Sequence, residues 1–452
     1  MDITSKNFFF SGDGQLPGGE GFYAGSASVG APYYAGSWGS AGITTTSGIT
    51  GLLSPRISSY GTGTGYLNFT SYNNSTKTFR VTRVASQPAS SRTNTNWVIY
   101  TGQFSGGRYP NYGCFSHGNY LYQTGSYNDG GFNTVYAFVV AFNLDTGTLA
   151  VDKNFTSYRP EFYDGCGDRT NEDIIYFLAQ TSDNSVGNQL IKMSANLSTT
   201  YWSKHVNIYR TSYRPETVDT DVLGNVLVSG LLSGSNGGIF WNKYDTNGGL
   251  IWSRSALPTD GGQTSTTVVG GMTGDSSGNT YCGCRFNGFN DYHLLKFSSN
   301  GTHQWTKSFT KYIYDMVTDN SGNLYVGFTE GFIVKLDTNG NVIWERQLGV
   351  SNSYSSSYSC FQMDCRVGDT ILVNHYNMIL SFDGSEGIPT GTLGNGSRTC
   401  RLPQITLVSS PLSLTISNQS YSLSNFSQSI SNGWWIDDGT STPVVTPQIF
   451  SY

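Results

Sequence analysis

Short apolar runs separated by polar turn signals recur three times between residues 221 and 344. Each copy reads D-x-x-G-N, then a β-branched or aromatic run such as LYVGF from Leu324, and then K-x-x-x-N-G-x-x-x-W. The glycine of the first turn supplies a positive φ, and Asn-Gly is the strongest short-range hairpin signal. The runs between the turns have the length and composition of strands. Each copy therefore predicts a four-stranded antiparallel meander.

The repeated positions identify the residues expected to hold the meanders together. Asn225, Asn279 and Asn323 are 54 and 44 residues apart, which matches four strands and their turns in a propeller blade. The tryptophan of each copy falls on the last strand, where a large ring can fill the gap between neighbouring blades. The expected structural residues are Asn225, Lys243, Gly248, Trp252, Asn279, Lys296, Gly301, Trp305, Asn323, Lys335, Gly340 and Trp344.

This repeat resembles those of the quinoprotein-like β-propellers, whose blades end in a glycine turn followed by a docking tryptophan. The resemblance implies an all-β propeller of about seven four-stranded blades, with six and eight as alternatives. It carries no chemistry, because a fold does not imply a function. Redox members of that family have adjacent cysteines and an acidic calcium site. No Cys-Cys pair occurs here, so we expect no quinone and no other cofactor.

Degenerate copies extend the repeat in both directions. The hexapeptide TSYRPE begins at Thr156 and again at Thr211, which indicates the openings of the third and fourth blades. We expect the first blade within residues 76–104 and the seventh from Phe361. The predicted domains are an N-terminal arm (1–75), the propeller (76–405), and a C-terminal β segment with a tail (406–452).

The two terminal segments combine many aromatic residues with few charges. Disordered linkers are poor in aromatic residues, so the first segment is either an arm that lays its rings on a partner subunit or an extra β-layer on the body. The alternating run from Leu412 predicts a strand, and part of the C-terminal segment is expected to complete the first blade and so remove sheet edges. The candidate contacts with a partner or a glycan are Phe8, Phe9, Phe10, Tyr33, Tyr34, Trp38, Trp434 and Trp435. For the tryptophan pair, burial in a core or interface is the more common role.

Composition limits the possible partners. Charged residues make up 12% of the chain, the net charge is -5 and no Lys/Arg cluster occurs, which argues against nucleic-acid binding. A surface of Ser, Thr, Asn and Tyr suits an exposed particle or an extracellular β-protein. However, the N-terminus lacks the pattern of a secretory signal, and the longest apolar run, residues 135–142, is too short to span a bilayer. A bacteriophage virion protein, made in the host cytoplasm, reconciles these observations.

Candidate catalytic groups have simpler structural interpretations. The carboxylate pairs are Asp219 with Asp221, Glu172 with Asp173, and Asp437 with Asp438. The first pair could flank a glycosidic bond, but Asp221 is also the turn residue of its repeat. Asp245 and Asp337 could bind Ca²⁺, yet turn aspartates usually satisfy their own backbone. The seven cysteines fit buried small hydrophobes rather than a disulfide scaffold or a zinc site, and we expect no metal.

The sequence thus predicts a non-enzymatic structural protein of a bacteriophage particle, in the tail, neck or head decoration. Its propeller would be a platform for other virion proteins, in multiple copies of a symmetric assembly. The alternatives are a host-receptor or glycan-binding, lectin-like adhesion module and, with less support, a polysaccharide hydrolase.

Overall fold

The computed structural model describes the chain in segments. The described residues are 34–38, 57–60, 66–73, 78–85, 98–104, 108–118, 120–128, 135–143, 149–155, 160–181, 188–206, 215–232, 238–257, 268–285, 291–349, 360–365, 370–375, 378–394, 398–401, 407–409, 415–418, 423–425, 430–432, 435–437 and 448–449. Strands dominate these residues, and the one helical turn among them is η3 (Thr329–Gly331). No helix in these segments is long and apolar enough to span a membrane.

Seven sheets each contain four strands that follow one another in sequence, and we number them blades 1 to 7. Blades 1 and 2 are β2 (Ile57–Tyr60), β3 (Tyr66–Asn73), β4 (Thr78–Ala85) and β5 (Val98–Phe104), then β6 (Arg108–His117), β7 (Tyr120–Asn128), β8 (Val135–Asn143) and β9 (Leu149–Phe155). Blades 3 and 4 are β10 (Pro160–Asp168), β11 (Asn171–Thr181), β12 (Asn188–Ser194) and β13 (Thr200–Val206), then β14 (Pro215–Thr220), β15 (Val226–Leu232), β16 (Gly238–Tyr244) and β17 (Leu250–Leu257). Blades 5 and 6 are β18 (Val268–Gly274), β19 (Thr280–Arg285), β20 (Tyr292–Phe297) and β21 (His303–Phe309), then β22 (Ile313–Thr318), β23 (Leu324–Phe328), β24 (Phe332–Leu336) and β25 (Val342–Gly349). Blade 7 is β26 (Cys360–Cys365), β27 (Thr370–His375), β28 (Met378–Asp383) and β29 (Ile388–Gly394).

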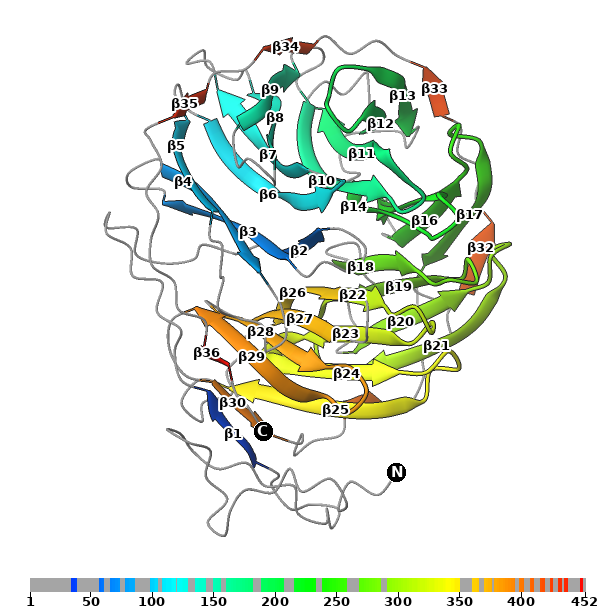
Figure 1. Ribbon diagram of the computed structural model, residues 1–452. Helices are drawn as coiled ribbons and strands as arrows, with labels where there is room; N and C mark the ends of the chain where they lie inside the picture. The colour runs from blue at the N-terminus through cyan, green and yellow to red at the C-terminus, as the bar shows by residue number, and fades with distance from the viewer. Residues whose placement is uncertain are drawn as a thin grey trace.

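The first strand of each blade lies at the centre of the molecule (Figure 1). These inner strands contact one another in order from β6 to β26, and β2 contacts both β6 and β26. The ring of blades is therefore closed. The chain is a seven-bladed β-propeller, as the repeat predicted. Because successive strands of a meander alternate in direction, the turns after the first and third strands of every blade share one face. We call it the turn face, and the opposite face the loop face.

The C-terminal segment forms a belt around the ring. Its strands are β30 (Arg398–Arg401), β31 (Val408–Ser409), β32 (Thr415–Asn418), β33 (Leu423–Asn425), β34 (Ile430–Asn432), β35 (Trp435–Asp437) and β36 (Gln448–Ile449). Each pairs antiparallel with the outermost strand of one blade, and the blades are visited in the order 6, 5, 4, 3, 2, 1 and 7. The belt thus runs once around the rim, opposite to the blade order (Figure 1).

This topology corrects the expected role of the C-terminal segment. Blade 1 already has four strands of its own, so β35 is its fifth strand and does not complete it. The tail instead adds an outer strand to all seven blades, and it begins at β30, before the expected boundary at residue 405. The belt strands are two to four residues long, which is too short for a periodicity that sequence could reveal.

The expected N-terminal boundary is also corrected. β2 and β3 pair with β4 and β5 in one sheet, so blade 1 begins at Ile57 and not at residue 76. The sequence between these two strands, residues 61–65, lacks the D-x-x-G-N pattern, so it gives no signal of a blade turn. Further upstream, β1 (Tyr34–Trp38) pairs antiparallel with β30 and becomes the sixth strand of the blade 6 sheet.

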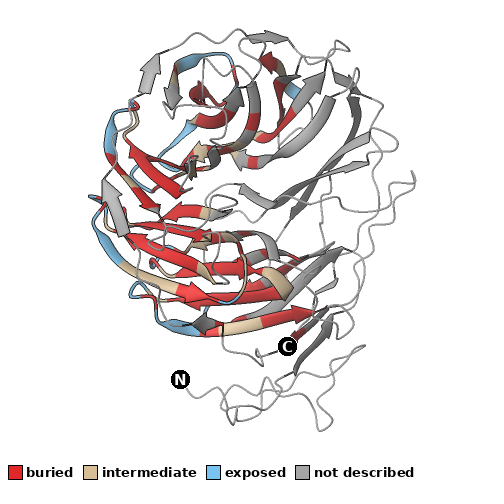
Figure 2. Ribbon diagram, turned by 180° about the vertical axis from the view of Figure 1, so that it is seen from behind, coloured by how far each residue is buried: buried red, intermediate tan, exposed pale blue. Residues whose placement is uncertain are grey.

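The apolar core lies between neighbouring blades. One cluster joins β23, β24 and β25 to blade 7 through residues such as Trp344, Leu348 and Ile371, and similar clusters join blades 2 to 3, 3 to 4, 4 to 5 and 5 to 6. Strands β12 and β16 are buried along their whole length, because the sheet is covered on both faces. Figure 2 shows buried residues through the body of the blades and exposed ones at their turns.

Candidate functional site

The aspartate of each D-x-x-G-N turn closes that turn with its side chain. In blade 4, Asp221 Oδ1 accepts hydrogen bonds from the backbone N–H groups of Leu223 and Asn225, both at 2.9 Å, and Oδ2 accepts one from the Asn225 amide. Asp275 and Asp319 make the same three bonds in blades 5 and 6. A carboxylate that satisfies turn N–H groups in this way is a structural residue.

The repeated lysine connects one blade to the next. Lys243 Nζ lies 2.6 Å from Asp221 Oδ2, both side chains are fully buried, and Nζ also donates to the carbonyl of Gly278 in blade 5. Lys296 and Lys335 donate to turn carbonyls of the following blades, at 2.7 and 3.0 Å. A buried cation needs such partners, because removing one partner of a buried pair costs about 3–5 kcal/mol.

The repeated tryptophans donate to the third turn of the following blade. Trp305 Nε1 donates to Thr338 O at 3.4 Å, the acceptor that Lys296 also uses. Trp344 Nε1 and Lys335 Nζ share the carbonyl of Gly384. Trp252 and the degenerate copy Trp202 donate to Ser299 O and Thr246 O. The ring of one blade therefore binds the third turn of the next, and the lysines Lys296 and Lys335 bind the same turn, whereas Lys243 binds the first turn of blade 5.

Both this docking and the backbone conformation require glycine at the turn positions. Gly301 has φ +80°, and a Cβ there would lie 2.6 Å from Cγ of Trp252 in the preceding blade. Gly340 has φ +79°, and a Cβ would lie 2.8 Å from Lys307. A glycine meets both demands at once, since it tolerates positive φ and leaves room for the neighbouring side chain.

Two further features of the docking were missed in the sequence. A cation stands two residues after each tryptophan, and Arg254 and Arg346 donate to the turn-glycine carbonyls Gly301 O and Gly387 O. The signal W-x-[KR] was readable in four blades, at Lys204, Arg254, Lys307 and Arg346. In addition, the residue before each of these tryptophans is the extra residue of a β-bulge, which re-aims the side chains that follow.

Exposed apolar side chains gather on the turn face at blade 4. Among the described residues, the large exposed ones are Tyr201, Val222, Leu223, Leu250, Ile251, Val342 and Ile343. Leu223 is 59% exposed and Tyr201 52%. We call the first five the blade 4 turn patch, because they belong to two turns of blade 4 and the adjoining strand of blade 3. A gathering of apolar side chains on a surface is typical of an interaction site.

The repeat provides a comparison that isolates these residues. The positions of Val222 and Leu223 hold Ser276 and Ser277 in blade 5 and Asn320 and Ser321 in blade 6, although the three turns make the same hydrogen bonds. The positions of Leu250 and Ile251 hold His303 and Gln304 in blade 5, whereas blade 6 has the exposed apolar residues Val342 and Ile343 there. The fold therefore does not require apolar residues at these exposed positions.

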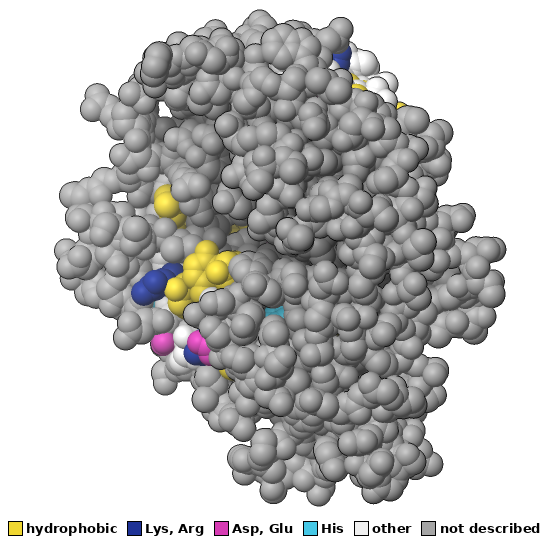
Figure 3. Space-filling view, turned by 90° about the vertical axis from the view of Figure 1, so that its left-hand side faces the viewer, with side chains coloured by type: hydrophobic (Ala, Val, Ile, Leu, Met, Phe, Trp, Pro, Cys, Tyr) yellow, Lys and Arg dark blue, Asp and Glu magenta, His cyan; other side chains and the backbone are white. Residues whose placement is uncertain are grey.

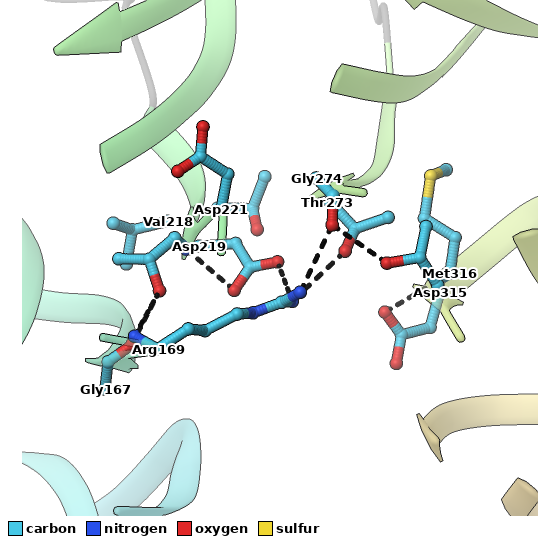
Figure 4. A network of polar contacts seen from close by, with 12 residues as sticks. Gly167, Arg169, Val218, Asp219, Asp221, Thr273, Gly274, Asp315 and Met316 are labelled. Carbon is cyan, nitrogen blue, oxygen red and sulfur yellow. Dashed lines mark hydrogen bonds and ion pairs between the residues drawn. The ribbon is translucent and has the colours of Figure 1, made fainter. Parts of the chain in front are cut away.

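A polar network lies on the inner side of the turn face (Figure 4). Arg169 in blade 3 donates to Asp219 Oδ2 in blade 4 at 2.8 Å and to Gly274 O in blade 5 at 3.2 Å. Thr318 Oγ1 of blade 6 donates to the same carbonyl. Burial raises the pKa of the Asp219 carboxyl above its usual value, and Arg169 opposes this shift. The network ties four successive blades together.

Asp219 and Asp221, which the sequence offers as a catalytic pair, each form an ion pair with a different cation. Asp219 pairs with Arg169, whereas Asp221 pairs with Lys243 inside its turn. Asp245 and Asp337 also cap their own turns. Glu172 and its neighbour Asp173 are exposed. Asp437 is the last residue of β35, and Asp438 lies outside the described residues.

Several cysteines and histidines are buried. Cys166, Cys282, Cys284 and Cys400 are buried free thiols, and burial raises the pKa of each, that of Cys400 to about 12. Burial also lowers the pKa of His293, whose Nδ1 lies 2.9 Å from Ser308 Oγ. Within the described segments, no group of three or more His, Cys, Asp or Glu residues could hold a metal ion.

The expected partner contacts lie mostly outside the described residues. Phe8, Phe9, Phe10, Tyr33 and Trp434 are in this category. Tyr34 and Trp38 are the ends of β1, and Trp435 begins β35, so these three belong to strands added at the rim.

Comparisons with known proteins identify propellers. No protein-family model matches the chain, and no curated protein matches it. Among solved structures, the Dos1 propeller is similar, with a TM-score of 0.44 and 10% identity over 77% of this chain and 95% of that chain. BamB from Moraxella catarrhalis is similar with a TM-score of 0.39 and 10% identity, over 76% and 81% of the two chains. The fold assignment itself rests on the strand pairing described above.

Proposed function

We propose that this chain is a non-enzymatic structural protein of a bacteriophage particle, a component of the tail, neck or head decoration. The propeller is its rigid platform, and neighbouring virion subunits are its partners, in multiple copies of a symmetric assembly. A low content of charged residues, 12%, and a composition rich in Ser, Thr, Asn and Tyr support an exposed assembly component.

The blade 4 turn patch is the observation that carries the proposal. Val222 and Leu223 are exposed where equivalent turns hold Ser or Asn, so the internal repeat offers no folding reason for them. Apolar residues that are both exposed and unnecessary for the fold favour a protein interface. The two turns lie against each other, since a Cβ at Gly224 would be 3.3 Å from Thr246. The first and third turns of blade 4 are therefore neighbours on the turn face.

The terminal segments support the same proposal. The chain places strands from both ends, β1 and the belt, on the outer edges of its own blades. Strand addition at an open sheet edge is a common mode of recognition between proteins. A chain that already uses this mode internally is suited to an assembly in which subunits are joined by extended segments.

Mass spectrometry of gradient-purified phage particles tests the proposal. Peptide amounts are calibrated against the major capsid protein of the same preparation. A fixed stoichiometry is the expected result, and the copy number then distinguishes tail or neck from capsid decoration. If the protein is absent from particles and present only in the soluble lysate, the proposal is wrong.

The patch itself can be tested by copying blade 5 into blade 4. Leu223→Ser combined with Ile251→Gln introduces the residues found at positions 277 and 304. Because both side chains are exposed, the free energy of unfolding should change by no more than about 0.5 kcal/mol. Incorporation of the tagged variant into particles, measured by quantitative immunoblot, should fall strongly, whereas the surface control Asn320→Ala should be incorporated normally. Normal incorporation of the double variant would remove the patch from the interface.

A further inference from the structure

The loop face carries a cluster of tyrosines at the junction of blades 5 and 6. Arg285 ends β19 and Tyr292 begins β20, while Tyr312 and Tyr314 lie in the link to β22 and in β22 itself. We call these four residues the loop-face tyrosine cluster. All four are half-buried, in contrast to Tyr281 on the same sheet, which is fully buried.

The rings of the cluster touch one another. The centroids of Tyr292 and Tyr312 are 5.0 Å apart with the rings at 65°, and those of Tyr312 and Tyr314 are 4.5 Å apart at 54°. The Arg285 guanidinium lies 5.1 Å from the Tyr292 ring centre, and its Nη1 donates to the phenol oxygen at 3.0 Å. Tilted rings held in this way form a fixed, partly exposed aromatic surface.

The propeller fold does not require this cluster. Six residues after the turn asparagine, blade 4 has Leu231 where blade 5 has Arg285. Four residues before the repeated lysine, blade 4 has Ile239 where blade 5 has Tyr292. Two aliphatic residues thus fill this position in one blade, and an arginine hydrogen-bonded to a tyrosine fills it in the next.

A strained turn that carries a charged residue is hydrogen-bonded to the backbone of the cluster. Glu330 in η3 has φ 59°, a conformation that non-glycine residues seldom adopt, and the N–H of Thr329 donates to Tyr312 O. The Glu330 carboxylate lies 2.8 Å from Lys311 Nζ, and both side chains are partly exposed. Backbone strain of this kind is concentrated at functional sites.

We propose that the loop-face tyrosine cluster, with Lys311 and Glu330, binds a pyranose ring of a neutral surface glycan. The C–H groups on one face of a pyranose carry partial positive charge and stack on the negative faces of aromatic rings. Its hydroxyls match the donors of Arg285 and Lys311 and the acceptor oxygens of Glu330. Figure 3, which views the molecule from the left-hand side of Figure 1, shows apolar side chains beside both Lys or Arg and Asp or Glu side chains.

The glycan site and the turn-face interface are independent. They lie on opposite faces of the ring, so one subunit can dock by the turn face while its loop face contacts a glycan. Absence of the protein from purified particles would refute the virion proposal and leave the glycan site standing. If the chain binds no glycan, the glycan site is refuted and the virion proposal stands.

The test uses a microarray of bacterial lipopolysaccharides and capsular polysaccharides, followed by saturation-transfer NMR with methyl hexopyranosides. The full-length chain should retain at least one neutral glycan. Tyr312→Ala should weaken that binding about tenfold or more, and Tyr312→Phe should keep most of it, because the stacking ring remains. Ile343→Ala shortens an exposed apolar side chain of the turn face outside the blade 4 turn patch and should bind like the unchanged chain.

Three results would overturn the inference. The unchanged chain could retain no neutral glycan on the array. Tyr312→Ala could bind as well as the unchanged chain, which would place the glycan elsewhere. Ile343→Ala could lose binding to the same extent, which would indicate a general effect on the fold. Thermal unfolding of each variant, recorded in parallel, separates the last case from a local loss.

Discussion

At the scale of single residues, the turn glycines differ in how many constraints they satisfy. Gly301 and Gly322 have nearly equal φ, +80° and +81°, but a Cβ would lie 2.6 Å from Trp252 at the first and 3.3 Å from Thr338 at the second. Gly322→Ala should therefore cost about 1–2 kcal/mol for the backbone alone. Gly301→Ala should cost about 1–3 kcal/mol more, because Trp252 must move.

Guanidinium unfolding of both variants measures this difference. The comparison is internally controlled, since the two glycines take the same place in turns with the same backbone hydrogen bonds, the third turn of blade 5 and the first turn of blade 6. Equal losses of unfolding free energy would show that the docked tryptophan adjusts at no cost.

Asp219 gives a residue-scale prediction for pH. Its pKa in the folded chain is raised above the usual 3.8, first by burial and against the effect of Arg169. A carboxyl with a raised folded pKa favours folding while it is protonated, and this contribution is lost as the pH rises from about 4 through the folded pKa. Asp219→Asn should therefore gain stability relative to the unchanged chain as the pH increases from 3 to 7. Unfolding curves of the two proteins across that range measure the effect, and a gain that shrinks with rising pH would contradict it.

At the scale of elements, the last strand of each blade is a docking element whose strength varies. Trp344 Nε1 donates to Gly384 O at 2.8 Å from a buried ring, whereas Trp305 is half-buried and its bond is 3.4 Å long. Phenylalanine removes the donor and part of the ring in both cases. Trp344→Phe should lose about 2–3 kcal/mol and Trp305→Phe about 1 kcal/mol or less. Thermal and denaturant unfolding measure both losses, and the reverse order would show that the bond length does not rank the docking contacts.

The elements that sequence could predict are those with local signals. Asn-Gly turns such as Asn300-Gly301 specify hairpins within a few residues, so the blades and their number were predictable. The edge to which a belt strand such as β31 pairs is a long-range choice, and two residues carry no periodic signal for it.

The candidate surfaces were harder to predict for a related reason. Leu250 and Ile251 look like core residues in the sequence, and only the bulge and the turn leave them exposed. The loop-face tyrosine cluster joins Tyr292 and Tyr312 from two blades, so its members are close in space and not in a motif. The W-x-[KR] cations, by contrast, were local and could have been found.

At the scale of the whole molecule, the belt covers edges that would otherwise pair with other chains. Ending the chain after Gly394 removes β30 to β36 and leaves all seven blades with four strands. Uncovered outer edges are templates for association, so this variant should unfold at a lower temperature and form oligomers. Ending it after Asn432 removes only β35 and β36 and should have a smaller effect.

Calorimetry and light scattering of the two truncated chains test this role. A monomeric, equally stable protein ending at Gly394 would show that the belt contributes nothing to closing the rim.

The reversed course of the belt also determines how the molecule responds to mechanical load. A pull applied beyond β36 acts first on blade 7 and then on blades 1, 2, 3, 4, 5 and 6 in turn, because the belt strands lie in that order. Each belt strand pairs with its own blade separately, so the tail detaches in steps and the force acts on one pairing at a time. The last strand, β30, is held between β25 and β1, which makes it the anchor. Until β30 detaches, the tail can lengthen while the seven blades keep their own strands.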